Sequence, residues 1–173
     1  MLDRADRSTG RLRSGYTLVE VLIVVVVLGI AAAMIVPQML SAGQLGVQAA
    51  ARMIIADIQY AQNDAVAAQA ERRLVFEPDS DRYRLTDASG QVLEVPWRSA
   101  GGARYEVSFQ EDQRFRGVEL VSADFDEEPV LVFDDLGAPE SGGRVVLKFN
   151  DQRYEVAVAP FTGRVTVQRL ADE

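Results

Sequence analysis

The sequence predicts an α+β protein in which one long N-terminal helix, membrane-spanning in its first half, packs on an antiparallel β-sheet or small β-sandwich. Three observations support this prediction. Residues 16–36 are almost entirely apolar, apolar residues then recur at helical spacing to about residue 73, and a two-residue period follows. We therefore expect a basic segment (1–15), a membrane helix (16–37), an amphipathic continuation (38–73) and a β-domain (74–173).

The first apolar run has the length of a membrane span. Tyr16 to Val36 is 21 residues, which as a helix covers roughly 32 Å, about the thickness of the hydrocarbon core of a bilayer. Glu20 is the one charged residue in the run, and four arginines precede it. Because positive charge stays on the cytoplasmic side, we expect a cytoplasmic N-terminus, with the residues after Pro37 on the far side of the membrane.

The helical pattern continues beyond Pro37. A proline at this place would normally end a helix, so we expect one helix from about Tyr16 to Arg73 with a kink or a local loosening at Pro37. The apolar positions that support the continuation are Val47, Ala50, Ala51, Ile54, Ile58, Ala61, Ala65 and Ala68.

From residue 74 onward, short β-rich runs alternate with turn-forming residues. The pair Asn150-Asp151 between two alternating runs predicts a tight hairpin. Half-buried strands of this kind form an antiparallel sheet that one helix can cover. The expected strands are 73–77, 82–87, 91–98, 104–109, 118–125, 129–135, 144–150, 153–160 and 163–170.

Composition excludes several kinds of chemistry. The chain has no cysteine and no histidine, which excludes disulfides, thiolate metal sites, His-ligated zinc and Ser-His or Cys-His nucleophile pairs. Its net charge is −8, and the first 15 residues carry four arginines against two aspartates, so the remainder carries −10. An acidic body of this kind repels nucleic acid. We expect no enzymatic activity and no cofactor.

The N-terminal segment "GYTLVEVLIVVVVLGIAAAMIVP" (15–37) resembles the type IV prepilin signature: glycine, aromatic, threonine, an apolar pair, glutamate, and a proline at the end of the apolar run. Residues 54–78 are similar to the helix-to-strand passage of the GspH/FimT group of minor pseudopilins. The segments "LVFDDLGAPESGGRVVLKF" and "VAVAPFTGRVTVQ" resemble the C-terminal strands of the same group.

The resemblance implies processing and assembly roles for the N-terminal residues. A prepilin peptidase would cut between Gly15 and Tyr16 and methylate the new amine of Tyr16. Glu20 would then pair with that amine on a neighbouring subunit, which relieves the cost of a carboxylate in hydrocarbon. Gly29 and Ala33 form a small-xxx-small pair that lets helices approach closely, and Pro37 belongs to the same assembly segment.

The function implied by the resemblance is that of a minor pseudopilin of a type II secretion system. Its partners would be other pseudopilins or pilins, the prepilin peptidase, the inner-membrane assembly platform and secreted cargo. It would cross the inner membrane once, place its C-terminal domain in the periplasm and enter a periplasmic filament. The alternatives are a FimT-like minor type IV pilin for pilus assembly or DNA uptake and, more remotely, an anchored envelope enzyme.

Two further groups of residues are candidate binding sites. Gly163-Arg164 looks like the Gly-Arg pair of the family, with a hairpin glycine beside an exposed arginine as the simpler interpretation. DNA-uptake members carry a basic residue two positions after that arginine, where this chain has Thr166. Asp124, Asp126 and Glu128 have carboxylates suited to calcium, although a solvated acidic loop is the simpler explanation, and we predict no metal.

Overall fold

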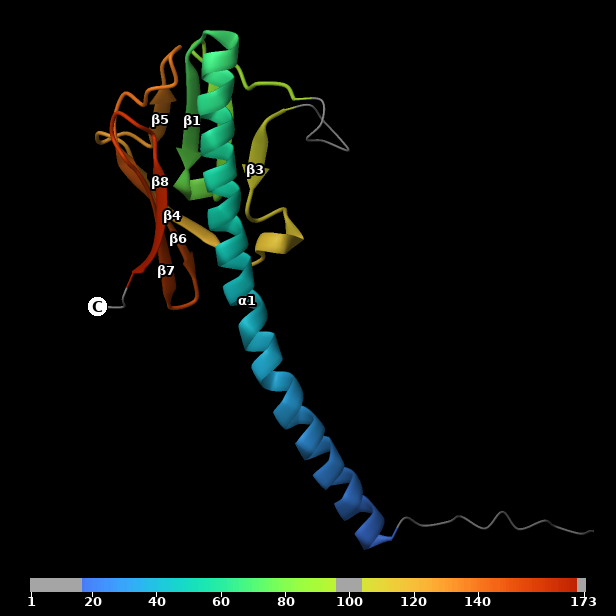
Figure 1. The fold of residues 1–173 in the computed structure, drawn as a ribbon. Helices are drawn as coiled ribbons and strands as arrows, with labels where there is room; N and C mark the ends of the chain where they lie inside the picture. The colour runs from blue at the N-terminus through green and yellow to red at the C-terminus, as the bar shows by residue number, and fades with distance from the viewer. Residues whose placement is uncertain (1–16, 96–103, 171–173) are drawn as a thin grey trace, which may run out of the picture. The chain divides into compact units, whose positions relative to one another are not determined.

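The computed structural model describes residues 17–95 and 104–170 of the chain, with only the backbone for residues 34–45 (Figure 1). The chain divides into two compact units, Met1–Met39 and Leu40–Glu173. One helix, α1 (Leu18–Ala68), contributes to both units. The expected basic segment 1–15 lies outside the described residues, as does Tyr16.

In the first unit, α1 begins with a side-chain cap. The hydroxyl of Thr17 accepts a hydrogen bond from the backbone N–H of Glu20 at 3.2 Å. Thr17 and Glu20 thus have the three-residue spacing of a capping box, in which an acid in the first turn also complements the helix dipole. The backbone remains helical through Pro37, so the proline does not end the helix, and the kink expected there stays a prediction.

In the second unit, α1 buries the apolar face that the sequence pattern predicts. The polar positions on the opposite face, including Gln48, Arg52 and Asn63, are exposed. Ala68, the last helical residue, is exposed too, because the helix ends there. The buried helical positions are Val47, Ala50, Ala51, Ile54, Ile58, Ala61 and Ala65.

The helix ends at Ala68, earlier than the expected Arg73, for a reason visible in its backbone. Gln69 adopts the left-handed conformation, with φ of 48°. The N–H of Gln69 bonds the carbonyl of Val66 at 3.3 Å, and the N–H of Ala70 bonds the carbonyl of Ala65 at 3.1 Å. These two bonds form a Schellman motif. Glycine usually occupies the left-handed position, so its absence concealed the helix end.

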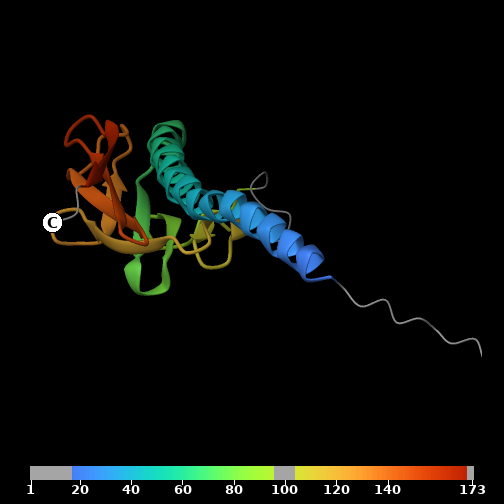
Figure 2. The ribbon, with the colours of Figure 1, turned by 90° about the horizontal axis from the view of Figure 1, so that it is seen from below.

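Two antiparallel sheets make up the rest of the second unit, which confirms the α+β fold class (Figures 1 and 2). Both contribute to one hydrophobic core with α1. Two short 3-10 turns lie between strands in the chain, η1 (Pro78–Ser80) and η2 (Gln113–Phe115). The first sheet has the order β3-β2-β1-β5, with β1 (Arg72–Glu77), β2 (Arg82–Asp87), β3 (Glu106–Ser108) and β5 (Val130–Phe133). The second has the order β4-β6-β7-β8, with β4 (Glu119–Asp124), β6 (Gly143–Phe149), β7 (Gln152–Val158) and β8 (Val165–Leu170).

Eight of the nine expected strands are present in the described residues, and the expected Asn150-Asp151 hairpin joins β6 to β7. The segment 91–98 is the exception. Its described part makes only isolated bridges, Thr86 to Val92 and Glu94 to Arg104, instead of a ladder. The N–H of Leu93 bonds Leu85 while its carbonyl bonds Tyr105, so the segment serves as a connector between β2 and the chain before β3. Residues 96–98 lie outside the described residues.

A buried carboxylate joins α1 to the first sheet. Asp57 is 5 % exposed and accepts hydrogen bonds from the hydroxyls of Tyr83 on β2 and Tyr105 just before β3, the latter at 2.8 Å. Tyr60, one helical turn further along α1, stacks on Tyr105 with ring centroids 5.2 Å apart. Because a buried carboxylate is costly without donors, this network fixes the rotation and the depth of the helix over the sheet.

A single glutamine joins α1 to two loops. The side-chain amide of Gln62 donates to the carbonyl of Gly137 at 2.7 Å and to that of Thr162 at 3.2 Å. Gly163 has φ of 65°, and a Cβ placed on it would lie 2.8 Å from the Gln62 amide nitrogen. Gly137 has φ of 80°, and a Cβ placed on it would lie 2.6 Å from a side-chain carbon of Val66. Glycine therefore permits the close approach at both loops.

Replacing Asp57 tests the carboxylate network. Asp57→Ala withdraws the acceptor from two buried hydroxyls, and we expect it to lower the free energy of unfolding by about 2–4 kcal/mol. Asp57→Asn keeps the shape of the side chain and one acceptor oxygen, so we expect it to lower the free energy of unfolding by less. Urea unfolding of the purified full-length chain in detergent measures both values. An Asp57→Ala variant no less stable than the exposed helix variant Asn63→Ala would contradict this role.

Replacing Gly163 tests the loop contact. Gly163→Ala is expected to cost about 1–3 kcal/mol, because a side chain is strained at positive φ and also meets Gln62. Gly90→Ala is the matched control, since Gly90 has φ of 83° and a Cβ added there would meet no atom within 4 Å. The same urea measurement separates the two causes. Equal losses in both variants would show that the contact with Gln62 contributes nothing.

Candidate functional site

The expected processing and assembly residues lie at the start of α1. Glu20 is exposed in the first helical turn. A Cβ added to Gly29 would meet no atom within 4 Å, and Ala33 one turn later is exposed, so this small-residue pair faces open space. Gly15 and Tyr16 lie outside the described residues, and Pro37 is described by its backbone alone.

The first unit presents an unusual surface, because its large apolar side chains are exposed all around the helix. Exposed apolar surface of this extent indicates contact with a membrane or with other proteins. Within the described residues, no helix combines the length and the hydropathy needed to cross a membrane. The exposed side chains, 51–82 % accessible, are Leu18, Val19, Val21, Leu22, Ile23, Val24, Val25, Val26, Val27, Leu28 and Ile30.

The structure separates the two members of the Gly163-Arg164 pair. Gly163 is buried against Gln62 and Phe133, which gives it a structural role in the turn between β7 and β8. Arg164, just before β8, is exposed, and Thr166 two positions later is exposed as well. The next arginine along the strand is Arg169, which faces the side of the sheet nearer to α1.

The acidic segment 124–128 forms a tight turn after β4. Asp126 and Glu127 have φ of 58° and 71°, and the carboxylate of Asp124 accepts a hydrogen bond from the N–H of Glu127 at 3.1 Å. Asp124 thus holds the turn. Across residues 17–95 and 104–170, no three acidic side chains are grouped so that they could hold a metal ion, so the calcium interpretation of Asp124, Asp126 and Glu128 gains no support.

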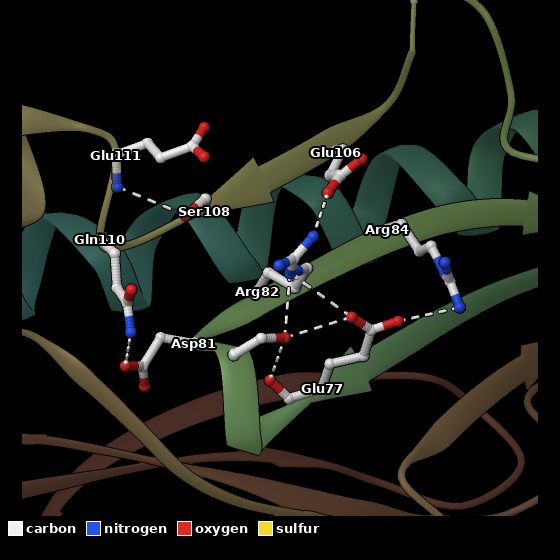
Figure 3. A network of polar contacts seen from close by, with 9 residues as sticks. Glu77, Asp81, Arg82, Arg84, Glu106, Ser108, Gln110 and Glu111 are labelled. Atoms are coloured by element: carbon white, nitrogen blue, oxygen red, sulfur yellow. Dashed lines mark hydrogen bonds and ion pairs between the residues drawn. The ribbon is translucent and has the colours of Figure 1, made fainter.

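A polar network surrounds the turn between β1 and β2 (Figure 3). Glu77 at the end of β1 pairs with Arg84 at 2.8 Å and with Arg82 at 3.5 Å. Arg82 also bonds Glu106 on β3 at 3.1 Å. These half-exposed pairs contribute little stability individually. Together they join three neighbouring strands of the first sheet on its outer side.

Asp81 connects the two sheets at the same turn. It has φ of 49°, and its carboxylate accepts a hydrogen bond from the N–H of Leu120 on β4 at 2.7 Å. The same carboxylate accepts a hydrogen bond from the side-chain amide of Gln110 at 2.9 Å (Figure 3). Its carbonyl accepts the N–H of Phe109. One residue thus fixes the first strand of the second sheet to a turn of the first.

Two half-exposed carboxyl groups, those of Asp87 and Asp112, have lowered pKa values. Hydrogen bonds from Arg114 hold the pKa of Asp112 below its usual range, because they favour the ionised form. The hydroxyl of Ser89 and the backbone N–H groups of Ser89 and Gln91 lower the pKa of Asp87. Both carboxylates support local turns, and that support is present at neutral pH and is lost as the pH falls through each lowered pKa.

Sequence reasoning missed the residues that hold the second unit together. The helical pattern singled out neither Asp57 nor Gln62, because both are polar residues among the apolar positions that defined the pattern. Asp81 follows Pro-Asp-Ser, which signals a turn but not its contact with β4. A signal for Asp57 was available, since a carboxylate beside Ile58 on a helix face requires a buried donor.

Comparisons with known proteins find similarity in the N-terminal segment and along most of the chain. Residues 10–36 match the family model described as the prokaryotic N-terminal methylation motif. The chain is also 27 % identical over 164 residues to a protein named type II secretion system protein H from Xanthomonas campestris pv. campestris. That alignment covers 94 % of this chain and 87 % of the relative.

Two kinds of solved structure are similar at low identity. The type IV minor pilin FimU of Pseudomonas aeruginosa aligns with a TM-score of 0.49 and 19 % identity, over 72 % of this chain and 88 % of that one. The minor pseudopilin EpsH from the type 2 secretion system of Vibrio cholerae aligns with a TM-score of 0.49 and 14 % identity, over 72 % and 95 % of the two chains.

The sequence comparisons support each other, because one covers residues 10–36 and the other nearly the whole chain. With a match to the methylation motif near its N-terminus, the chain is similar over nearly its whole length to a type II secretion system protein H.

Proposed function

We propose that this protein is a minor pseudopilin, a structural subunit that assembles into the pseudopilus of a type II secretion system through its N-terminal helix. Its work is assembly and requires no catalytic chemistry. Processing by a prepilin peptidase between Gly15 and Tyr16 precedes assembly. The mature subunit spans the inner membrane once and carries its β-domain in the periplasm.

The observation that carries this proposal is the exposed apolar surface of residues 18–30. A helix that is apolar on every side is stable only when lipid or other helices surround it. Each exposed large side chain gains about 1.5–3 kcal/mol when it is fully buried. Lipid covers these side chains before assembly, and the helices of neighbouring subunits cover them afterwards. The same surface therefore serves the membrane-bound and the assembled state.

Glu20 determines how neighbouring helices align. Apolar side chains pack in many registers, because the gain from burying them is not directional. A carboxylate among them costs about 2.5–3.5 kcal/mol at the centre of a spanning helix, and a cation on the next subunit removes part of this cost. The methylated amine of Tyr16, released by cleavage, is that cation.

Glu20 also has a local role that an experiment must separate from pairing. Its N–H donates a hydrogen bond to the hydroxyl of Thr17, and Glu and Gln are both favoured at this spacing after a Thr cap. Glu20→Gln therefore keeps the capping residue type and removes only the charge. Thr17→Ala does the reverse, because it removes the cap and leaves the carboxylate.

The N-terminus of the membrane-bound protein tests processing. We expect mass spectrometry of protein from its own cells to find a chain that begins with N-methylated Tyr16. The same analysis in cells that lack the prepilin peptidase is expected to find the uncleaved chain. An N-terminus elsewhere, or the same N-terminus in both strains, would refute the proposal.

The charge of Glu20 is tested by assembly. We expect Glu20→Gln to enter the membrane normally but to reduce incorporation into sheared filaments about tenfold or more, since the amine loses its counter-charge. Incorporation is measured by quantitative immunoblotting of filament and membrane fractions. Thr17→Ala, as the control, is expected to assemble to near the parental level. If Glu20→Gln assembled normally, Glu20 would not align the subunits.

A further inference from the structure

The four edges of the two sheets differ in how well they are protected from further pairing. β3 has only three residues, and a β-bulge between Leu120 and Ser122 interrupts β4. The loop after β5 folds back on it, with a bridge from Phe133 to Pro139. Short strands, bulges and covering loops are the usual protection against edge pairing.

The fourth edge, β8, has none of these features in the described residues. It pairs with β7 in an unbroken register from Leu170 opposite Arg153 to Val165 opposite Val158. Its other edge pairs with no strand among residues 17–95 and 104–170. Every second residue of this six-residue strand therefore directs its N–H and carbonyl groups to the unpaired side, where another strand can bind them.

A groove runs beside this edge, between β8 and α1. Its volume is about 420 Å³. Val167, which alternates with polar neighbours and would ordinarily face a core, is 43 % exposed in it. The inner face of β7 is buried, whereas on the same side of β8 Val167 and Arg169 are exposed. The lining residues are Gln48, Ala51, Arg52, Ile55, Tyr154, Val167 and Arg169.

The groove is positively charged, whereas the protein as a whole is negatively charged. Arg52 on α1 and Arg169 on β8 both line it, are exposed, and form no ion pair within the described part of the chain. The chain as a whole carries −8. Two unpaired cations beside an apolar floor favour a ligand that brings carboxylates on either side of an apolar side chain.

We propose that β8 binds an extended, acidic segment of a partner protein as an additional strand of the second sheet. The backbone of the segment pairs with the free edge of β8. Every second side chain then enters the groove, where carboxylates meet Arg52 and Arg169 and an apolar side chain covers Val167. Backbone bonds provide the affinity of such an interaction, and the side chains in the groove provide its specificity.

A second copy of this chain fits the groove less well. Residues 165–170 of β8 contain no acid. Pairing of β8 with the β8 of another copy would therefore leave the two arginines without counter-charges. The inference also concerns only the second unit, so it can fail while the proposed assembly through the N-terminal helix stands, and the reverse also holds.

A short peptide can test the interaction with the full-length chain in detergent. The probe is capped Glu-Thr-Val-Thr-Glu, which places two carboxylates and one valine on the same side of a strand. We expect it to slow amide hydrogen exchange in residues 165–170 and to bind more weakly as the salt concentration rises. Arg52→Gln with Arg169→Gln is expected to weaken binding about tenfold or more.

Three controls isolate the mode of binding. Arg153→Gln removes an exposed arginine from the other face of β7, and binding should stay unchanged. The peptide with lysines in place of glutamates should not bind. The original peptide with methylated backbone amides should not bind either, because it lacks the donors that a strand needs.

Several results would overturn the inference. The inference fails if the peptide protects only amides outside β8, or if either control peptide binds as tightly as the original peptide. It also fails if the double arginine variant binds the original peptide as tightly as the parent protein does. Concentration-dependent protection of β8 without any peptide, together with dimers in analytical ultracentrifugation, would also overturn it and assign the edge to a second copy. Unchanged exchange in β6 and β7 shows that each variant is folded.

Discussion

The buried carboxylate of Asp57 is the constraint on which the second unit depends. The helix face around it consists mostly of alanine, valine and isoleucine, which pack acceptably at several rotations and depths. A carboxylate inside that face is tolerated only where donors meet it. Tyr83 and Tyr105, from two different parts of the first sheet, provide these donors. The polar network therefore selects one arrangement among several that the hydrophobic effect would accept.

The position of α1 explains why one sheet edge is left open. Gln62 bonds two loops, one of which leads into β8, so the end of the helix is held at that turn. Nearer the start of this part of the helix, Ile55 and Arg52 stand apart from Val167 and leave the groove between them. The strand order ends with β8, whose inner face the helix does not cover. The open edge thus follows from where the helix is fixed.

The two proposed contact surfaces use different physics. The apolar residues 18–30 associate through the burial of surface, which is strong but weakly directional, and Glu20 supplies the direction. The edge of β8 associates through backbone hydrogen bonds, which fix strand direction and register but need side chains to select a partner. A subunit that uses both can be held in a helical assembly and still present a separate, selective site.

The sequence by itself determined the helix and eight of the nine expected strands, in their order. The apolar run, the 3.6-residue pattern from Val47 to Ala65 and the alternation of the strands each report local burial, which depends on neighbours within a few residues. Only the tertiary structure decided which polar residues act. Asp57, Gln62 and Asp81 bond groups far away in the chain, the most distant 100 positions apart. No local pattern encodes such contacts, because they depend on how the helix and the two sheets meet in space. The same limit applies to Val167, whose spacing indicates burial although the helix leaves it exposed.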